Sequence, residues 1–432
     1  MMSPALIAYR LMTRVLEPLA PRLLDARVKQ GKEDQKRVDE RLGIAGRPRP
    51  AGDLVWLHGV SVGETLSLLP VVERFRKQRP DLTLLVTSGT LTSAELLARR
   101  LPPEVIHQFA PVDGPAAVAR FLDHWRPGLG IFVESELWPN LITAAQVRRL
   151  KLALVSARIT EKTAGGWGRA PGMARRILSA FDRVMPQDEA SAARLEAMGA
   201  RIDGLVNLKL SGGPLPHDTA AFSHLSAAIG DRPVVVAAST HPGEELAIVH
   251  ALDNLADRIC LILVPRHPER GVEVATALTR EGYRFVLRSR GGTLGSDTDL
   301  YVADTLGELG LFLRLADVVI MGGSFGSSLG LAPVGGHNPL EPARLGKPLI
   351  AGPDAANWAT VTTDLRAAGG LSVVESPAGL SGTIAALLAD PAAARAMGDR
   401  ARRAAADAGS GLDRLWDALQ PLVPTDRGSL RL

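Results

Sequence analysis

The chain has 432 residues, of which 46% are hydrophobic and 22% are charged, and lysine and arginine exceed aspartate and glutamate by 50 to 46. This composition is globular and excludes a disordered or low-complexity chain, and the length favours two domains over one. The small positive excess is spread along the sequence without an aromatic RNA-binding run or a zinc finger, so we expect no nucleic-acid partner.

The N-terminal segment is apolar but carries several charges. Residues 4–24 are interrupted by Arg10, Arg14, Glu17 and Arg22, whereas a membrane-spanning helix requires about 20 mostly uncharged residues. No small-residue cleavage site follows an unbroken apolar core, so we expect no signal peptide. The apolar positions that share one helical face are Leu6, Ile7, Leu11, Val15, Leu19 and Leu23. Two interpretations fit this face equally well: a helix lying on an anionic membrane surface and a helix packed on the body of the protein.

From Asp53 the chain alternates short apolar runs with amphipathic helical stretches. Strands are predicted at 54–58, 82–87, 105–109, 129–133 and 152–156, with a helix at 64–78 after the first of them. Such alternation is typical of parallel strands joined by crossover helices.

A glycine- and proline-rich break at 211–216 interrupts this pattern, which then restarts. The second series has strands at 234–238, 259–264, 285–287, 318–321 and 349–351, helices from Glu244 and Glu269, and closing helices at 392–408 and 412–419. We therefore expect two Rossmann-like α/β domains facing a central cleft. The expected divisions are a lead-in at 1–50, a first domain at 51–212 and a second at 213–432, whose last helix is a candidate to cross back to the first.

Residues that form disulfides or metal sites are sparse. The single cysteine, Cys260, lies within an apolar run and is expected to be a buried thiol, which indicates a reducing, intracellular setting. Histidines that follow predicted strands occur one per loop, without the spacing of a zinc site, and they are His58, His241, His267 and His337. We expect neither a metal nor a cofactor.

The segment HGVSVGE at 58–64 follows the first predicted strand and offers two candidate reactive groups. Its G-x-S-x-G core matches the nucleophile elbow of serine hydrolases, with Ser61 as the nucleophile. In those enzymes the elbow follows several strands, so its position after the first strand argues against a hydrolase. Glu64 opens the next predicted helix, where the helix dipole favours a carboxylate. The functional alternative for Glu64 is a general base at the mouth of a cleft.

Further charged candidates lie at a strand end and near the linker. Glu134 and Glu136, in ESELWPN, follow the strand at 129–133, and an extended chain would place both on the same side. Two buried carboxylates without a partner are costly, so the alternative to a functional site is a solvated loop. Lys209, in VNLKL, is either a surface lysine with its stem on apolar residues or a charge at the interdomain crossing.

The second half carries the signals for anion binding. Two segments follow predicted strands and open predicted helices, STHPGEE at 239–245 and VPRHPER at 264–270, and a third, DTLGE at 304–308, precedes another helix. Arg266 stands where a bidentate phosphate contact is made. After a glycine-rich loop, Asn338, Pro339 and Glu341 match the N-cap, N1 and N3 positions of a helix whose N-terminus would suit a phosphate.

Seven segments, in this order, resemble the bacterial Kdo transferases, which move 3-deoxy-D-manno-octulosonic acid (Kdo) from CMP-Kdo to a lipid A precursor. They are HGVSVGE, ESELWPN, VNLKL, STHPGEE, LVPRHPER, DTLGEL and GGHNPLE, and the similarity covers residues 37–425. The resemblance implies a GT-B fold with an N-terminal acceptor domain and a C-terminal CMP-sugar domain. It also implies CMP-Kdo, a lipid A precursor and an anionic membrane surface as partners, at the cytoplasmic face of the bacterial inner membrane.

The resemblance assigns a role to individual residues. Glu64 corresponds to the family's proton acceptor in an inverting transfer, and Glu134 and Lys209 correspond to positions thought to stabilise the transition state. The CMP-binding segments correspond to Pro265, Arg266, Leu306, Gly307, Glu308, Asn338, Pro339, Leu340 and Glu341. Glu134 would either offset the positive charge of an oxocarbenium-like transition state or position Glu64, and the sequence does not choose between these roles. Ser61 then becomes a turn residue or a ligand contact.

The sequence departs from the family pattern in two places. The loop between Gly323 and Gly335 is longer than expected, and the N-terminal segment is more charged than a membrane anchor. Because a fold does not determine a function, two alternatives stay open. One is a UDP-sugar-dependent transferase or epimerase of the same architecture, and the other is a non-catalytic protein that binds lipid A or a membrane.

Overall fold

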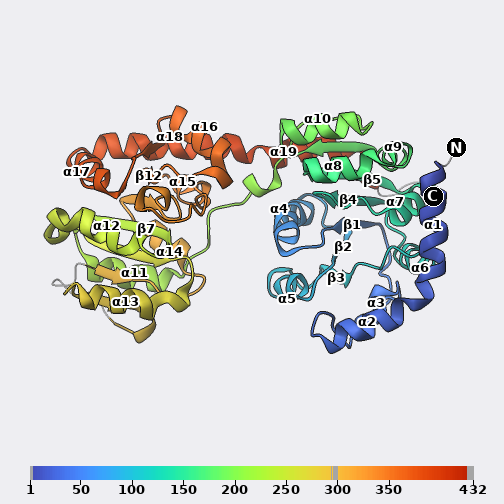
Figure 1. The fold of residues 1–432 in the computed structure, drawn as a ribbon, viewed down its shortest axis with the longest axis horizontal. Helices are drawn as coiled ribbons and strands as arrows, with labels where there is room; N and C mark the ends of the chain where they lie inside the picture. Colours follow the sequence, from blue (N-terminus) through green and yellow to red (C-terminus); the bar gives the residue numbers. More distant parts are fainter. Residues whose placement is uncertain (1–2, 293, 295–299, 426–432) are drawn as a thin grey trace. The chain divides into compact units, whose positions relative to one another are not determined.

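The structure, a computed structural model, describes residues 3–292, 294 and 300–425, so the outer ends of the expected segments 1–50 and 213–432, and part of the latter's interior, lie outside the described residues. It divides into two compact units, Met1–Gly212 with Gly409–Leu432 and Gly213–Ala408. Each unit contains one parallel sheet covered by helices on both faces (Figure 1). This confirms the predicted α/β class.

The sheet of the first unit has the strand order β3-β2-β1-β4-β5-β6. Its strands are β1 (Leu54–His58), β2 (Thr83–Ser88), β3 (Ile106–Phe109), β4 (Leu129–Val133), β5 (Lys151–Ala157) and β6 (Arg183–Pro186). Its helices are α1 (Pro4–Leu16), η1 (Glu17–Leu19), α2 (Ala20–Lys29), α3 (Val38–Arg41), α4 (Val62–Gln78), α5 (Leu91–Arg100), α6 (Pro115–Trp125), α7 (Pro139–Val147), α8 (Glu161–Gly168), α9 (Pro171–Leu178), α10 (Glu189–Ala197), η2 (Leu208–Leu210), α19 (Gly411–Leu419) and η9 (Gln420–Leu422). The strand order reverses between β1 and β4, where His58 pairs with Phe132, and ligands of such sheets bind beyond the carboxyl ends at the reversal.

Both faces of this sheet are buried under aromatic side chains. On one face the ring of Trp56 lies 5.0 Å from that of Phe121 and 4.9 Å from that of Phe132. On the other face Phe75 of α4 meets Trp416 of α19 edge-on, with ring centroids 5.0 Å apart. Aromatic pairs at this separation add to the energy of burial. Helix α19 therefore completes the core of the first unit, although it follows the whole second unit in sequence.

The sheet of the second unit has the strand order β13-β12-β11-β7-β8-β10-β9. Its strands are β7 (Val234–Thr240), β8 (Cys260–Pro265), β9 (Phe285–Leu287), β10 (Leu300–Val302), β11 (Val318–Met321), β12 (Leu349–Ala351) and β13 (Leu371–Val373). Its helices are α11 (Thr219–Ile229), α12 (Glu244–Leu252), η3 (Asp253–Arg258), η4 (Pro268–Arg270), α13 (Gly271–Arg280), η5 (Arg288–Arg290), α14 (Leu309–Leu315), η6 (Ser327–Leu329), α15 (Leu340–Arg344), η7 (Ala356–Trp358), α16 (Ala359–Ala367), η8 (Pro377–Gly379), α17 (Leu380–Ala389) and α18 (Pro391–Gly409). Cys260 is buried in β8, as predicted.

The N-terminal helix α1 runs along the first unit (Figure 1) and is fastened to it by polar side chains. The Tyr9 hydroxyl donates to Asp113 Oδ2 over 2.9 Å, and Asn140 Nδ2 donates to Thr13 Oγ1 over 2.9 Å. The same Asp113 carboxylate accepts from the backbone N–H groups of Asn140 and Leu141. Asp113 thereby caps the N-terminus of α7 and holds α1 at the same time.

Glu17 makes a second attachment of this kind at the start of α6. Its carboxylate accepts from the backbone N–H groups of Ala116 and Ala117 at 2.9 and 2.6 Å. Gly114 makes room for it, because a Cβ at that position would lie 2.5 Å from the carboxyl carbon of Glu17. A carboxylate is favoured at a helix N-terminus both by the hydrogen bonds and by the dipole.

The outer face of this N-terminal segment is apolar and exposed. Leu6, one of the residues predicted to share a face, is buried, whereas Val15 is 74% exposed and Leu23 is 64% exposed. Other large apolar side chains exposed on the same segment are Ile7, Leu11, Met12, Leu16 and Leu19. The helix thus packs on the protein and also presents an unpaired apolar surface. In the described part of the chain no helix has the length and apolarity to cross a membrane.

We expect Asp113→Ala to lower the free energy of unfolding by about 2–3 kcal/mol, because it leaves buried donors on α7 without an acceptor. It should also loosen α1, so that hydrogen exchange of residues 4–16 becomes faster while that of α12 does not change. Asp123→Ala is the matched control, because Asp123 pairs with Arg148 on the surface and its side chain is 64% exposed. Unchanged exchange in α1 would show that Asp113 does not hold it.

Candidate functional site

The loop after β1 fixes Glu64 at the N-terminus of α4. Ser61 is the N-cap of this helix, and its hydroxyl donates to Glu64 Oε1 over 2.8 Å. The backbone N–H of Val60 donates to Glu64 Oε2 over 2.6 Å. Both oxygens are therefore held in one orientation, while the residue keeps part of its surface exposed.

The same hydrogen bonds argue against Ser61 as a nucleophile. Its hydroxyl donates to Glu64 and its oxygen accepts from the Glu64 N–H, whereas the neighbouring His58 Nδ1 lies 2.9 Å from Thr87 Oγ1. A serine nucleophile requires a general base within hydrogen-bonding reach of its hydroxyl, ordinarily a histidine. Within the described residues no histidine contacts the Ser61 hydroxyl. The segment therefore matches the nucleophile elbow in sequence, but it lacks the hydrogen bonds of a serine nucleophile.

Glu134 follows β4, the neighbour of β1, and it forms an ion pair with Lys209. The distance from Lys209 Nζ to Glu134 Oε1 is 2.6 Å. Lys209 lies on η2, where the Asn207 side chain accepts from its backbone N–H. The sequence near Glu134 contains no cation, and the partner is supplied by a segment that follows β6. The structure therefore joins two of the three predicted catalytic residues directly.

The backbone of Glu134 is left-handed, with φ of 56°. The extended geometry that we expected for Glu134 and Glu136 is therefore wrong, because the chain turns at the end of β4. A non-glycine residue in this region costs on the order of 1–3 kcal/mol, and such strain is concentrated at functional sites. The turn aims the Glu134 carboxylate at Lys209, which an extended continuation of β4 would not do.

Glu136 is a residue that the sequence singled out without assigning it a role. Burial raises its pKa to about 7, and the charges of Glu64 and Glu134 act in the same direction. Trp138 Nε1 donates to its Oε2 over 2.5 Å, which opposes that rise. These couplings show that the three glutamates share one environment at the carboxyl ends of β1 and β4.

His58 forms the floor of this environment and is uncharged at neutral pH. Burial lowers its pKa to about 3, and the charge of Arg41 adds to this effect. Its Nε2 atom is buried without a hydrogen-bond partner in the described residues and lies 3.9 Å from Glu136 Oε2. A neutral imidazole and the carboxylates of Glu64 and Glu134 therefore lie near Glu136, and neither carboxylate lowers its pKa.

In the second unit, two glutamates of STHPGEE build the framework of the anion-binding segments. Glu244 accepts from the backbone N–H groups of His241, Gly323 and Phe325 at 2.9, 2.7 and 3.0 Å. It therefore ties the loop after β11 to the loop after β7. Glu245 accepts from Thr240 Oγ1 and from Arg270, each over 2.8 Å. Both acids are buried and already paired, so neither is a candidate base.

The predicted CMP-binding residues follow β8, β10 and β11, which with β7 form four consecutive strands of the sheet. Pro265 ends β8, and the exposed Arg266 side chain has no ion pair with any residue that the structure describes. After β10, Leu306 is 86% exposed, and Gly307 has φ of 86°. Glu308 forms an ion pair with Arg288, with 2.7 Å between Oε1 and Nη2, so one of its carboxylate oxygens already has a partner.

The prediction that Asn338 is the N-cap of the helix is wrong by one residue. Helix α15 begins at Leu340 and Pro339 is its N-cap, although Asn338 Oδ1 still accepts from the Leu340 N–H over 3.1 Å. Asn338 Nδ2 lies 3.4 Å from Glu341 Oε1. The sequence pattern identified the contact but placed the helix too early, and a helix of five residues has only a weak dipole.

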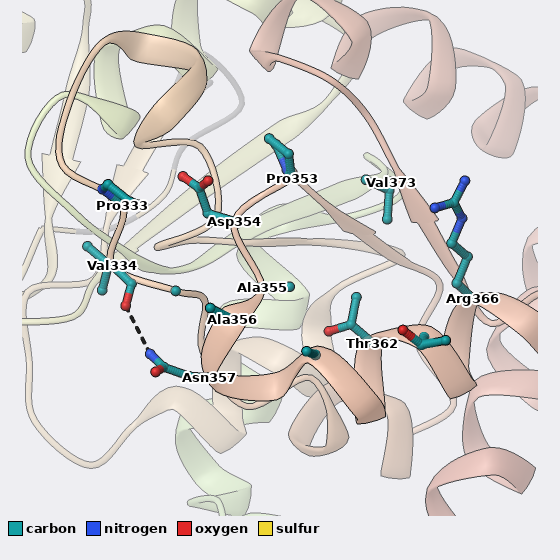
Figure 2. Close-up of a pocket in the computed structure, with 14 residues that line it drawn as sticks. Pro333, Val334, Pro353, Asp354, Ala355, Ala356, Asn357, Thr362, Arg366 and Val373 are labelled. Carbon is teal, nitrogen blue, oxygen red and sulfur yellow. Dashed lines mark hydrogen bonds between the residues drawn. The ribbon is translucent and has the colours of Figure 1, made fainter.

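The long loop after β11 is clipped against the segment that follows β12. Asp354 accepts from the Ser327 N–H over 2.7 Å, and Asn357 Nδ2 donates to the Val334 carbonyl over 2.9 Å. Figure 2 shows the pocket beside this clip, with Thr362 and Arg366 of α16 facing Pro333 and Val334 across it. Its volume is about 690 Å³. The extra length of the loop thus forms a wall of a pocket separate from Arg266.

Among the described residues no three His, Cys, Asp or Glu side chains are grouped so that they could hold a metal ion.

Comparisons with known proteins agree with the resemblance seen in the motifs. The family model described as 3-deoxy-D-manno-octulosonic-acid transferase (kdotransferase) matches residues 36–211. The chain is 34% identical over 350 residues to a 3-deoxy-D-manno-octulosonic acid transferase of Rickettsia bellii, covering 80% of this chain and 82% of the relative. It is also 34% identical over 398 residues to the enzyme of that name from Bordetella pertussis, covering 88% and 90%.

Solved structures show the same fold at much lower identity. A UDP-GlcNAc 2-epimerase from Neisseria meningitidis, bound to UDP-GlcNAc, has a TM-score of 0.56 and 14% identity, covering 86% of this chain and 100% of that one. At this identity the likeness carries the fold alone. It confirms the predicted GT-B fold class.

We expect Glu136 to make stability fall as the pH rises. Its pKa is raised from 4.5 to about 7 in the folded protein, so the folded state retains a proton that the unfolded state loses between these values. Relative to Glu136→Gln, the wild type should lose up to about 3 kcal/mol of unfolding free energy between pH 4.5 and pH 8. Urea denaturation at several pH values measures the difference. Glu161→Gln is the surface control, because the Glu161 side chain is 90% exposed. A difference that does not vary with pH would contradict the raised pKa.

Proposed function

Because the chain belongs to the 3-deoxy-D-manno-octulosonic acid (Kdo) transferase family, and is therefore a glycosyltransferase, we propose that it transfers Kdo from CMP-Kdo to a lipid A precursor with inversion and with Glu64 as the general base. The observation that carries this proposal is the position of Glu64, fixed through both carboxylate oxygens beside the Glu134–Lys209 ion pair.

Glu64 suits the task of removing a proton from the attacking hydroxyl. The transfer needs a base that is ionised, oriented and reachable from solvent. The Val60 N–H and the Ser61 hydroxyl fix the orientation of the Glu64 carboxylate without covering the residue completely. As the hydroxyl attacks the anomeric carbon, its proton passes to Glu64 and the bond from that carbon to the CMP phosphate breaks.

Glu134 and Lys209 are proposed to act as one unit. Lys209 forms an ion pair with Glu134, and a carboxylate at this position can offset the positive charge that develops on the sugar ring. Removal of Lys209 would leave a partly buried carboxylate without its partner, and removal of Glu134 would release a cation beside Glu64. The two substitutions should therefore have effects that are not additive.

The donor is proposed to be bound by the segments after β8, β10 and β11. Arg266 is exposed and has no ion pair among the described residues, as expected of a guanidinium that receives a phosphate from solution. Leu306 offers an exposed apolar surface close to the backbone of Gly307. The cytidine phosphate departs as an anion, and a fixed cation stabilises that charge.

The acceptor is proposed to reach the enzyme from a membrane, at the cytoplasmic face of the inner membrane. The apolar face of α1 and α2 carries Leu11, Val15 and Leu23 on its outside, with Arg14 and Arg22 in the same segment. A helix of this composition binds the interface of an anionic bilayer through buried apolar area and charge attraction. The polar attachments of α1 would hold the first unit against that surface.

We expect Glu64→Gln to abolish transfer, because the amide has no basic oxygen, while binding of CMP-Kdo changes less than twofold. The assay mixes protein, CMP-Kdo and a tetraacylated lipid A precursor without added metal and weighs the lipid by mass spectrometry. Glu73→Gln, on the exposed side of the same helix, is the control. Near-normal turnover in Glu64→Gln would show that Glu64 is not the general base. An unchanged lipid with the wild type would point to UDP-sugar donors, which the same assay tests next.

We expect replacement of Leu11, Val15 and Leu23 by glutamine to weaken binding to anionic vesicles more than tenfold. Burial of each such side chain contributes about 1.5–3 kcal/mol, so three polar substitutions remove a large part of the apolar contribution, although Ile7, Met12, Leu16 and Leu19 stay exposed on the same segment. Cosedimentation with phosphatidylglycerol-containing vesicles measures the binding. Val272→Gln controls for a change in exposed apolar area elsewhere, since Val272 is 65% exposed on α13. Equal binding by the triple variant would show that this face is not the membrane surface.

A further inference from the structure

Two histidines of the second unit share a hydrogen bond beside Arg266. The Nε2 atoms of His241 and His337 are 2.8 Å apart, and the two rings are nearly parallel, with an angle of 9° between them. His241 follows β7 and His337 precedes α15, so the pair joins two of the anion-binding segments. A third ring, His267, lies edge-on to His241 with centroids 6.2 Å apart.

The Nε2–Nε2 contact restricts how many protons the pair can hold. One ring must donate and the other must accept, because two protonated rings would direct two N–H groups at each other. Burial lowers the pKa of both histidines, that of His337 to about 4. Positive neighbours act in the same direction, chiefly His267 on His241, and His241 and Arg266 on His337. Without a ligand the pair is therefore neutral at pH 7.

The carboxylates around the pair are bound to other groups, and the charge of Glu245, which raises the pKa of His241, has a smaller effect than burial, His267 and Arg270, which lower it. Glu244 accepts from three backbone N–H groups, and Glu245 is bound to Arg270 and Thr240. In α15, one carboxylate oxygen of Glu341 accepts from Asn338 Nδ2, and burial raises the pKa of Glu341. The other charges that face the rings are the cations Arg266 and Arg270 and the imidazole of His267. Hydrogen-bond donors and positive charges therefore predominate around the two rings, which favours binding of an anion there.

Gly323 leaves space for the two rings. A Cβ at this position would lie 2.9 Å from His337 Cδ2, 3.0 Å from His337 Nε2 and 3.4 Å from His241 Cδ2, and the residue has φ of 68°. Glu244 fixes the backbone of this glycine through its N–H. The pair is therefore held in place by the protein framework and does not depend on a chance contact of two mobile side chains.

We propose that His241 and His337 are further donor-binding residues, and that the pair takes up one proton from solvent when the phosphate of the sugar nucleotide binds beside Arg266. An anion placed against the rings stabilises an imidazolium, and one ring turns its new N–H toward a phosphate oxygen. Because the two sites are coupled, the proton belongs to the pair and not to one ring. This inference rests on the proposed function, in which the second unit binds CMP-Kdo.

The test is calorimetric binding of CMP-Kdo to the full chain, without acceptor, in buffers of different ionisation enthalpy at pH 7. CMP-Kdo is chosen because its phosphate is a diester, whereas a phosphate monoester itself titrates near pH 6. The dependence of the measured heat on the buffer gives the number of protons taken up. We expect an uptake approaching one proton in the wild type, and an affinity that rises as the pH falls from 8 to 6.

Substitutions distinguish the role of the histidine pair from the assignment of the second unit as the CMP-Kdo-binding unit. His241→Gln and His337→Gln should each bind about 10-fold more weakly, by the loss of a charge-assisted hydrogen bond, and should take up almost no proton. His250→Gln is the control, since His250 lies on α12 beside Glu281 with its side chain 50% exposed. Binding by the wild type without proton uptake would overturn the role of the pair and leave the donor assignment intact. Absence of CMP-Kdo binding in the wild type would overturn both.

A measurement on the wild type alone guards against variants that fail to fold. The ring Cε1 protons of histidine move when the imidazole becomes protonated, so proton NMR of the unsubstituted protein can follow the pair directly. Addition of CMP-Kdo at pH 7 should shift two histidine signals toward the imidazolium position. If saturating CMP-Kdo leaves all histidine signals in the neutral position, the inference is wrong.

Discussion

Backbone N–H groups in the loops that leave a parallel sheet need acceptors, and carboxylates supply them throughout this protein. Buried backbone donors are almost always satisfied in folded proteins, and the strand ladder cannot reach those beyond its last residue. Glu64 accepts from Val60, Asp113 from the start of α7, and Glu244 from three amides in two loops. Glu17 does the same at the start of α6. Each acid fixes a loop or a helix start, and each of these positions lies at or near a residue with a proposed function.

This constraint also explains why acids with similar neighbours have different properties. Glu64 gains two donors and keeps exposed surface, Glu134 gains a lysine, and Glu136 gains only the indole N–H of Trp138 while it is buried. Its pKa therefore rises to about 7. Three glutamates within one small region thus differ in their burial and in their partners, which is the usual physical basis for a division of roles in a site.

Much of this arrangement could be predicted from the sequence, because long apolar runs such as 54–58 and 129–133 have a clear period and lie at the positions predicted for them. The short strands β6, β10 and β13 are absent from the prediction, whereas the equally short β9, β11 and β12 are predicted. Periodicity alone therefore does not identify strands of three or four residues. Motif order identified the family.

Contacts between distant segments could not be predicted: the partner of Glu134 is Lys209, and the left-handed backbone of Glu134 has no signature in its residue type. The histidine pair likewise joins residues 241 and 337, which only the sheet order brings together.

The position of α19 has a consequence for synthesis on the ribosome. The first unit includes Phe75 near its beginning and Trp416 near the end of the described chain, and these rings pack against each other. During translation the surface of α4 that α19 covers must stay open to water until the residues of the second unit, 213–408, have also been made. The second unit is continuous in sequence and can complete its own core earlier. Nascent chains of this protein therefore expose apolar surface on α4 throughout synthesis of the second unit, and exposed apolar surface of this kind is what chaperones bind.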